Sequence, residues 1–320
     1  MRRKLASPLP QRHGLDAARL WLPPEGSWAT IRDHLVERLP RVDPARIDAM
    51  LVGQEIIGMD GPVKLDAPYR PDSFVWFHRD LPVEVPVPFE IRVLHRDEDL
   101  VVVDKPHFLA TIPRGRHVVE TALVRLRREL DLPELSPAHR LDRVTAGLVM
   151  FVVRRERRGV YQTMFRDRRV FKEYEAIAEA DPALRVPRTV RSRIVKERGI
   201  INAQEVEGPP NSESVIELLA ERSGLGRYRL LPKTGRTHQL RLHMSSLGVP
   251  ILGDDFYPTL VETALDDFRR PLQLLAKVLE FTDPITGEPR RFESRSTLTA
   301  WTSYADWAGD DRSGSAGSSS

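Results

Sequence analysis

The chain has 320 residues, of which 41% are apolar and 30% charged, a composition typical of globular proteins and outside the ranges of disordered or membrane proteins. Its 49 lysines and arginines against 46 aspartates and glutamates leave a net charge of +3, too small to indicate a polyanionic partner by itself. There is no cysteine, secretory signal or long apolar run, which excludes disulfides, thiolate nucleophiles and cysteine-ligated zinc and predicts a soluble, cytoplasmic protein without a membrane span.

The amino-terminal part predicts an arm followed by a small module. Residues 1–25 are rich in proline and arginine and have no clear period, so we expect a flexible arm. Residues 26–80 predict a small α+β module, in which Ser27 caps a helix that ends at Pro40, a short second helix runs over residues 43–51, and apolar pieces joined by turns form a hairpin.

A second domain is predicted over residues 90–305, after a proline-containing extended linker at 81–89 and before a disordered tail at 306–320. Strands dominate this domain, and helices are interspersed without βαβ alternation, which predicts an α+β fold on a mixed, mostly antiparallel sheet. The expected elements are two strands within 91–105, a helix at 120–130, a strand at 147–153, an amphipathic helix at 154–168, strands near 171–180, 190–204, 213–219 and 228–235, a helix at 237–247 and a strand at 277–281.

The segment 154–169 is rich in arginine and poor in acidic residues. Such a segment can neutralise phosphates, or it can simply be the solvated face of a helix. The sequence of this segment favours neither reading until a site is found nearby.

A carboxylate flanked by two arginines stands in the segment HRLDRVTAGL, immediately before a buried strand. The guanidinium groups of Arg140 and Arg143 favour the ionised form of Asp142, as a nucleophile or a base requires. On these residues alone, a structural Asp–Arg pair in a turn is the simpler explanation.

A second informative block is LPKTGRTHQLRLH at residues 231–243, a strand, a tight turn at Gly235 and the start of a helix. Backbone donors and the charge of Arg236 converge at the amino end of this helix, which favours an anion there. His243 shares one helix face with apolar residues and is expected to be packed in the core, without a role as base or ligand.

Together these segments resemble the RluA-type family of RNA pseudouridine synthases. HRLDRVTAGL is similar to the family signature HRLDxxTSGL, KTGRTHQLRLH to KTGRTHQLRxH, residues 248–257 to GxPIxGDxxY, and FKEYEA at 171–176 to the KxYxA strand. The resemblance covers about residues 85–295 and implies a sheet of the pseudouridine synthase type. The preceding module resembles a degenerate alpha-L RNA-binding domain, in which Arg46 alone stands where basic residues are usual, so it either has lost RNA affinity or is a structural cap.

The resemblance also implies roles for individual residues. Asp142 would be the catalytic carboxylate, and Arg241 would pair with it and keep it charged. Tyr174 would pack on the everted uracil, and Arg140 would occupy the place that this base leaves. The other expected substrate-binding residues are His139, Thr145, Lys172, Lys233, Arg236 and His238.

The implied function is isomerisation of a specific uridine in structured RNA, ribosomal or transfer RNA, to pseudouridine by a monomeric enzyme without metal or organic cofactor. The nucleotide must leave the helical stack for its base to rotate. A non-catalytic RNA-binding protein on the same fold is the alternative, although it predicts loss of the carboxylate, and a hydrolase would need a second carboxylate, for which Asp254 or Glu173 has no support. The sequence leaves open whether Asp142 attacks C1′ or removes a proton from C2′, and which RNA is modified.

Overall fold

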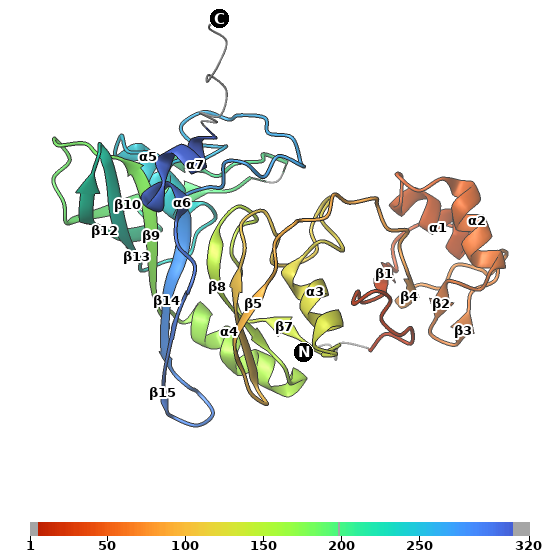
Figure 1. Cartoon of the computed structure of the whole chain (residues 1–320). Helices are drawn as coiled ribbons and strands as arrows, with labels where there is room; N and C mark the ends of the chain where they lie inside the picture. Colours follow the sequence, from red (N-terminus) through yellow and green to blue (C-terminus); the bar gives the residue numbers. More distant parts are fainter. Residues whose placement is uncertain (1–5, 198, 310–320) are drawn as a thin grey trace, which may run out of the picture. The chain divides into compact units, whose positions relative to one another are not determined.

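The computed structural model describes residues 6–197 and 199–309, in a chain that divides into two compact units, Met1–Val83 and Glu84–Ser320 (Figure 1). Within this described part of the chain, no helix has the length and apolar character needed to cross a bilayer.

The first unit holds a four-stranded antiparallel sheet in the order β1-β4-β2-β3 together with two helices. In chain order the elements are β1 (Ala18–Leu22), α1 (Ile31–Arg38), α2 (Pro44–Val52), β2 (Ile57–Gly58), β3 (Gly61–Pro62) and β4 (Ser73–Phe77). The flexible arm predicted over residues 1–25 is therefore wrong for its last part, since β1 pairs along its whole length with β4. The prediction from composition did not find this strand, because β1 is stabilised by pairing with β4, which is distant in sequence.

Both helices of this unit begin at side-chain caps. Thr30 caps α1, in place of the predicted Ser27: its hydroxyl accepts a hydrogen bond from the backbone N–H of Asp33, whose carboxylate accepts one from the N–H of Thr30. Asp43 caps α2, and Pro44 occupies the first turn, where its missing N–H costs nothing. The caps fix where each helix starts.

The linker predicted over residues 81–89 contains no helix or strand. From Glu84 onward it belongs to the second unit, because the carboxylate of Glu84 accepts hydrogen bonds from the backbone N–H groups of Val118, Val119 and Glu120. The first residues of this extended segment, up to Val83, belong to the first unit, so the boundary between the units falls within the segment.

The second unit is built on an 11-stranded sheet in the order β11-β10-β12-β13-β9-β14-β8-β6-β5, with β15 added beside β14 and β7 beside β8 (Figure 1). β8 and β14 pair in parallel and the other pairings are antiparallel, so the predicted mixed, mostly antiparallel α+β fold is confirmed. The strands are β5 (Arg92–Arg96), β6 (Leu100–Lys105), β7 (Ser136–Pro137), β8 (Ala146–Val152), β9 (Phe171–Glu179), β10 (Arg188–Val195), β11 (Gln204–Val206), β12 (Ser212–Arg222), β13 (Leu225–Pro232), β14 (Leu274–Thr282) and β15 (Pro289–Glu293).

The helices of this unit are short. They are α3 (Ala122–Glu129), the 3₁₀ turn η1 (Arg155–Arg157), α4 (Arg158–Arg166), α5 (Gln239–Ser246), α6 (Thr299–Thr302) and α7 (Tyr304–Ala308). The tail predicted to be disordered over residues 306–320 lies outside the described residues from 310 onward, and its first residues belong to α7.

Two hydrophobic cores lie on opposite faces of the central strands. Every residue of β6 and β8 is buried, which explains why β8 and residues 100–103 of β6 are continuous apolar runs. Because successive side chains of a strand point to opposite faces, Val101 and Val103 pack in the core that contains α3, whereas Leu100 and Val102 pack in the core that contains α4. β8 divides its side chains in the same way.

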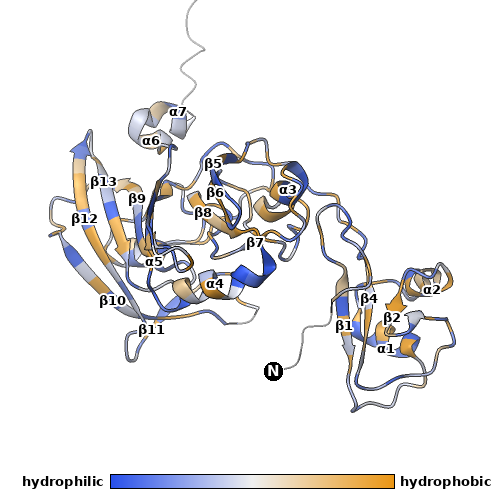
Figure 2. Ribbon diagram, turned by 90° about the horizontal axis from the view of Figure 1, so that it is seen from below, coloured by the Kyte–Doolittle hydropathy of each residue, from blue (hydrophilic) through white to orange (hydrophobic). Residues whose placement is uncertain are grey.

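The segment 154–169 forms η1, α4 and the turn that follows. Tyr161 and Met164 bury the apolar face of α4 against the second core, Val160 and Phe165 pack beside them, and hydrophilic residues dominate the rest of this segment (Figure 2). At its amino end, the Arg154 guanidinium is paired with Asp99 at 2.6 Å. The guanidinium of Arg154 is therefore engaged in a structural ion pair, which neither interpretation of the sequence included.

The parallel contact between β8 and β14 depends on Gly147. Its backbone has φ +107°, and an added Cβ would lie 2.3 Å from the carbonyl oxygen of Ala276, the residue that it faces in the register. A side chain here meets main chain that cannot rotate away, in a conformation that costs other residues free energy.

We expect Gly147→Ala to lower the free energy of unfolding of the second unit by on the order of 3 kcal/mol, since β8 and β14 must separate to admit the methyl group. Gly159→Ala is the matched control, because Gly159 is an exposed position of α4 with no atom within 4 Å of the added Cβ. Thermal unfolding followed by circular dichroism measures both. Equal melting temperatures for the two variants would contradict the prediction.

Candidate active site

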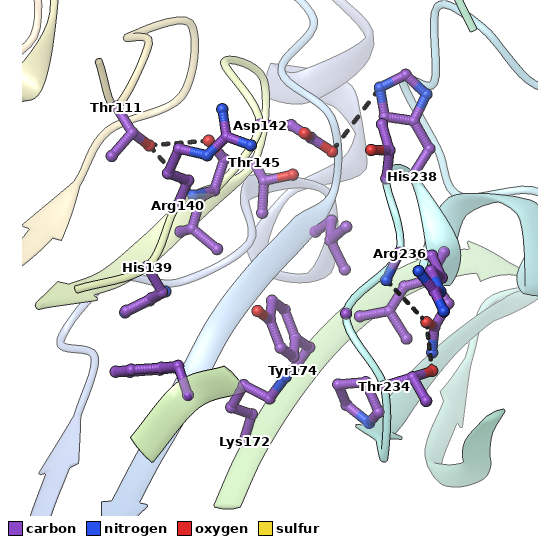
Figure 3. A pocket seen from close by; sticks show the side chains of 18 of the residues that line it. Thr111, His139, Arg140, Asp142, Thr145, Lys172, Tyr174, Thr234, Arg236 and His238 are labelled. Carbon is purple, nitrogen blue, oxygen red and sulfur yellow. Dashed lines mark hydrogen bonds and ion pairs between the residues drawn. The ribbon is translucent and has the colours of Figure 1, made fainter. Parts of the chain in front are cut away.

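One open cavity of about 740 Å³ lies in the second unit, where three chain segments meet. The loop between β7 and β8 supplies one wall, β9 the floor, and the turn between β13 and α5 the opposite wall (Figure 3). The volume suits a ligand the size of a nucleotide. All of the site residues predicted from the sequence line this cavity, namely His139, Arg140, Asp142, Thr145, Lys172, Tyr174, Lys233, Arg236, His238 and Arg241.

The cavity is strongly basic. Asp142 is the one carboxylate among the described residues that line it. In that described part of the chain, no three His, Asp or Glu side chains gather closely enough to hold a metal ion. A polyanion can approach such a surface, where positive charge surrounds a single negative group. The lysines and arginines in its lining are Arg114, Arg140, Arg143, Arg166, Arg168, Lys172, Lys233, Arg236 and Arg241.

The loop that carries Asp142 is held by Thr111, which the sequence reasoning missed. The buried hydroxyl of Thr111 donates to the carbonyl of Leu141 at 2.8 Å and accepts from the N–H of the same residue at 3.1 Å. Within the loop, the N–H of Thr145 donates to the carbonyl of Asp142 at 3.2 Å. The backbone on both sides of Asp142 is thus fixed, while its side chain stays 39% exposed to the cavity.

The predicted pairing of Arg241 with Asp142 is wrong as a direct contact. The Arg241 guanidinium donates to both carboxylate oxygens of Asp254, at 2.8 and 2.5 Å, and to Asp255 at 2.7 Å. Asp254 is almost fully buried and needs a charged partner, whereas Asp142 is open to solvent. The bidentate pair therefore forms at the buried carboxylate.

The charge of Asp142 still acts on Arg241 through space. Burial lowers the pKa of Arg241, but the hydrogen bonds and charge of Asp254, with the charges of Asp142 and Asp255, outweigh it and raise the pKa above its usual range. The guanidinium lies under the rings of Phe256 and Tyr257, 4.8 and 5.5 Å from their centroids. Arg241 is thus a fixed positive charge in the wall near Asp142.

His238 provides the cation nearest to Asp142 when its ring is protonated. Its Nε2 lies 3.9 Å from the Asp142 carboxylate, and its Nδ1 lies 2.9 Å from the hydroxyl of Tyr257 (Figure 3). The residue stands just before α5 with φ +56°, a left-handed conformation that turns the ring back toward the loop. Burial lowers the pKa of His238, the charge of Asp142 opposes this, and the charge of Arg241 adds to it.

Tyr174 and Lys172 project from the same face of β9 into the cavity (Figure 3). This placement follows the period of two in the strand. Burial, and then the negative charge of Asp142, raise the pKa of the Tyr174 phenol above its usual range, so it stays protonated. Burial lowers the pKa of Lys172, and the neighbouring Arg168 adds to the effect.

His139 is part of the wall. Its ring stacks on Phe165 at a centroid distance of 4.4 Å, and its Nε2 accepts a hydrogen bond from the N–H of Met150 at 3.2 Å. Burial, with the charge of Lys172, lowers the pKa of His139 to about 3. The ring is therefore neutral and anchors the loop to β8.

The turn before α5 is closed by Gln239, a second residue that the sequence reasoning missed. The side-chain oxygen of Gln239 accepts hydrogen bonds from the hydroxyl of Thr234 at 2.6 Å and from the N–H of Arg236 at 3.1 Å. Its amide nitrogen donates to the carbonyl of Glu213 and to Ser214. The sequence predicted that the backbone N–H of Arg236 helps to bind an anion. In the structure this N–H instead donates to the side chain of Gln239.

Lys105 is a third residue that sequence reasoning passed over, although it lies at the end of the strands predicted within residues 91–105. It is fully buried, and its ammonium group donates to the carbonyls of Pro106, Leu109 and Arg143 at 2.9, 2.8 and 3.3 Å. Burial lowers the pKa of Lys105 to about 7, against the effect of the nearby negative charge of Asp142. One cation thus joins the loop after β6 to the residue that follows Asp142.

We expect Lys105→Met to lower the free energy of unfolding by about 2–4 kcal/mol, because three buried carbonyls lose their donor. Lys277→Met is the control: Lys277 donates to a single carbonyl, that of Ser294, on β14 outside the cavity lining, and should cost about 1 kcal/mol. Chemical denaturation measures both values. A Lys105→Met protein as stable as the control variant would contradict the proposal that Lys105 stabilises the fold by joining these backbone carbonyls.

Comparison with known proteins agrees with this geometry. Residues 99–246 match the family model described as RNA pseudouridylate synthase. The dual-specificity RNA pseudouridine synthase RluA of Haemophilus influenzae is 32% identical over 219 residues, which cover 64% of this chain and 92% of that protein. The chain belongs to the RluA-type family of RNA pseudouridine synthases. As a pseudouridine synthase it is an intramolecular isomerase.

Two further similarities bear on the RluA-type assignment. Human pseudouridylate synthase RPUSD2 is 38% identical over 176 residues, which cover 54% of this chain but only 32% of the human protein, so the chain spans about a third of that relative. The solved structure of human RNA pseudouridylate synthase domain containing 4 aligns with a TM-score of 0.53 at 24% identity, covering 68% of this chain and 93% of that one. The second unit thus has the α+β fold of the pseudouridine synthases.

Proposed function

We propose that this RluA-type protein converts a specific uridine of a structured RNA to pseudouridine, with Asp142 as the catalytic carboxylate. The observation that carries this proposal is that Asp142 is the one carboxylate among the described residues that line a nucleotide-sized cavity, whose lining also holds nine lysines and arginines. In the reaction the bond from N1 to C1′ breaks, the uracil rotates, C5 bonds to C1′, the proton on C5 is released to solvent, and N1 takes up a proton. The base must be extruded from its helix to do so, which a cavity of this size accommodates.

The residues around Asp142 divide the remaining tasks. Tyr174 offers a flat, protonated ring for stacking of the everted uracil. Arg140 is exposed at the loop and fills the space that the base vacates. Arg241 supports the charge of Asp142 through space from its pair with Asp254. The proposed contacts to the ribose and phosphates come from His139, Thr145, Lys172, Lys233, Arg236 and His238.

Release of the C5 hydrogen gives the experiment. RNA labelled with tritium at C5 of uridine, from cells that lack the gene, is incubated with the purified protein, and tritium in the solvent is counted. Release of tritium supports the proposal. RNA binding without release would instead identify a non-catalytic RNA-binding protein and overturn it.

The substrate is proposed to be ribosomal or transfer RNA in the cytoplasm, and the protein to act as a monomer. Pseudouridine maps of RNA from cells with and without the gene identify the uridine, and size-exclusion chromatography with light scattering tests the monomer. If the pseudouridine that is lost without the gene lies in an RNA other than ribosomal or transfer RNA, the proposed substrate class is contradicted.

For the domain arrangement, we propose a catalytic domain over residues 90–305, joined by the extended segment at 81–89 to a degenerate alpha-L module that ends at residue 80 and begins with β1, before the predicted residue 26. Its Arg46 supports the loss of RNA affinity, because the guanidinium already donates to Asp80 and Glu55, at 2.9 and 3.0 Å. Arg46→Gln should therefore leave the Kd for labelled RNA within about twofold. A tenfold weaker Kd would mean that the module binds RNA.

A further inference from the structure

The hydroxyl of Tyr257 lies within hydrogen-bond distance of three groups. The carbonyl oxygen of Ala203 is 2.7 Å away, the backbone nitrogen of Ala203 is 3.0 Å away, and Nδ1 of His238 is 2.9 Å away. Tyr257 is buried, so these contacts are made away from bulk water.

Counting protons fixes the direction of each contact. A carbonyl oxygen can only accept, so the single proton of the Tyr257 hydroxyl goes to the carbonyl of Ala203. The N–H of Ala203 can only donate, and it does so to the tyrosine oxygen. With its own proton used, that oxygen can only accept from His238, whose Nδ1 must therefore carry the ring proton.

The tyrosine keeps this role at neutral pH. Burial raises the pKa of Tyr257 to about 12, while the hydrogen bond to Ala203 opposes the rise. The groups that act on the charge of His238 are Asp142, Asp254 and Asp255, which favour the imidazolium, and Arg241, which opposes it. Burial of the ring, with only 9% of the side chain exposed, is the largest effect and leaves the imidazole neutral.

A neutral ring protonated at Nδ1 presents a bare Nε2 to the cavity. This atom faces the Asp142 carboxylate across 3.9 Å, which is too long for a hydrogen bond, and both atoms are acceptors. A hydroxyl of the substrate has one proton, and a hydroxyl about 2.8 Å from Nε2 can donate this proton to it. The bare Nε2 thus offers an acceptor for one substrate hydroxyl beside Asp142.

We propose that His238 recognises the ribose of the target uridine by accepting a hydrogen bond from its 2′-hydroxyl at Nε2. This inference rests on the proposed function, since Asp142 must reach C1′ or C2′ of that ribose. In either role of Asp142, the 2′-hydroxyl is the sugar donor beside the reacting carbons. His238 is then a positioning residue that holds the sugar against Asp142 and selects RNA over DNA, because DNA lacks this donor.

The tautomer is tested without any substrate. The protein is labelled with ¹⁵N-histidine, and His238→Asn, which tolerates the left-handed backbone, identifies the signals of His238 by their loss. We expect a protonated, pyrrole-type Nδ1 and a bare, pyridine-type Nε2. Tyr257→Phe removes the acceptor and should shift His238 toward the opposite tautomer. A proton on Nε2 in the unmodified protein would overturn the inference.

The ribose contact is tested with two synthetic RNA hairpins that carry the modified uridine, one with ribose and one with 2′-deoxyribose at that position. Loss of the hydroxyl should lower kcat/KM of the unmodified protein on the order of 10-fold, because the buried Nε2 of His238 loses its donor. In His238→Asn the same loss should cost less than about threefold. Arg166→Ala, at the cavity rim, should slow both hairpins equally and keep the full ratio.

The outcomes separate the two proposals. An unchanged hydroxyl effect in His238→Asn would overturn the ribose contact while leaving the pseudouridine synthase function intact. Absence of turnover on every RNA would overturn the proposed function, and the ribose contact with it, whereas the ¹⁵N spectra would still report the tautomer.

Discussion

Asp142→Asn should abolish tritium release from RNA, with a loss of at least about 1,000-fold in kcat. The amide has the shape of the carboxylate but can act neither as a nucleophile nor as a base, and no other carboxylate among the described residues lines the cavity to replace it. Because the side chain is partly exposed and the loop is held through its backbone, the fold should keep its stability to within about 0.5 kcal/mol.

The matched control is Asp167→Asn. Asp167 ends α4 close to the arginines of the rim but is not part of the cavity lining, so removing its charge should change kcat less than about twofold. Full activity of Asp142→Asn, measured at saturating RNA, would eliminate the carboxylate mechanism. Loss of activity in both variants would mean that removing any negative charge near the cavity lowers activity, and would contradict a specific role of Asp142.

Arg241→Met should lower the free energy of unfolding by about 3–5 kcal/mol and abolish activity, because Asp254 would be left as a buried charge without its partner. The flexible methionine keeps the packing against Phe256 and Tyr257, so the loss of stability reports mainly on the charge. Chemical denaturation and RNA turnover measure the two effects.

A second substitution separates stability from catalysis. In Arg241→Met with Asp254→Asn, the unpaired charge is gone, and we expect about half of the lost stability to return. Activity should stay low, because the positive charge that acts on Asp142 remains absent. A double variant no more stable than the single one would contradict the role of the buried pair.

Much of the second unit could be predicted from the sequence for a physical reason. β8 and residues 100–103 of β6 are continuous apolar runs because both of their faces are buried, and short runs of this kind, bounded by turn residues, are typical of buried strands. The cavity residues were found because they cluster in a few uninterrupted segments. That these segments meet in one cavity could not be predicted without the order of the strands in the sheet, in which β14 separates β9 from β8.

The sequence could not predict which of several possible partners a charged residue or a strand pairs with. Several carboxylates lie in reach of Arg241, and burial of Asp254 decides between them, a quantity that local sequence does not contain. β1 escaped notice for a similar reason, since its pairing with β4 is a long-range contact. Thr111, Gln239 and Lys105 act through backbone groups of distant segments, which leave no local pattern.

The alternation of β6 and β8 between two cores also limits how the protein can vary. Deleting one residue inside either strand would transfer every following side chain to the opposite layer, so both layers would lose their packing at once. Changes of length are therefore tolerable in the connecting loops but not in these two strands. The frame that carries Asp142 should accept substitutions of one apolar residue for another far more readily than insertions or deletions.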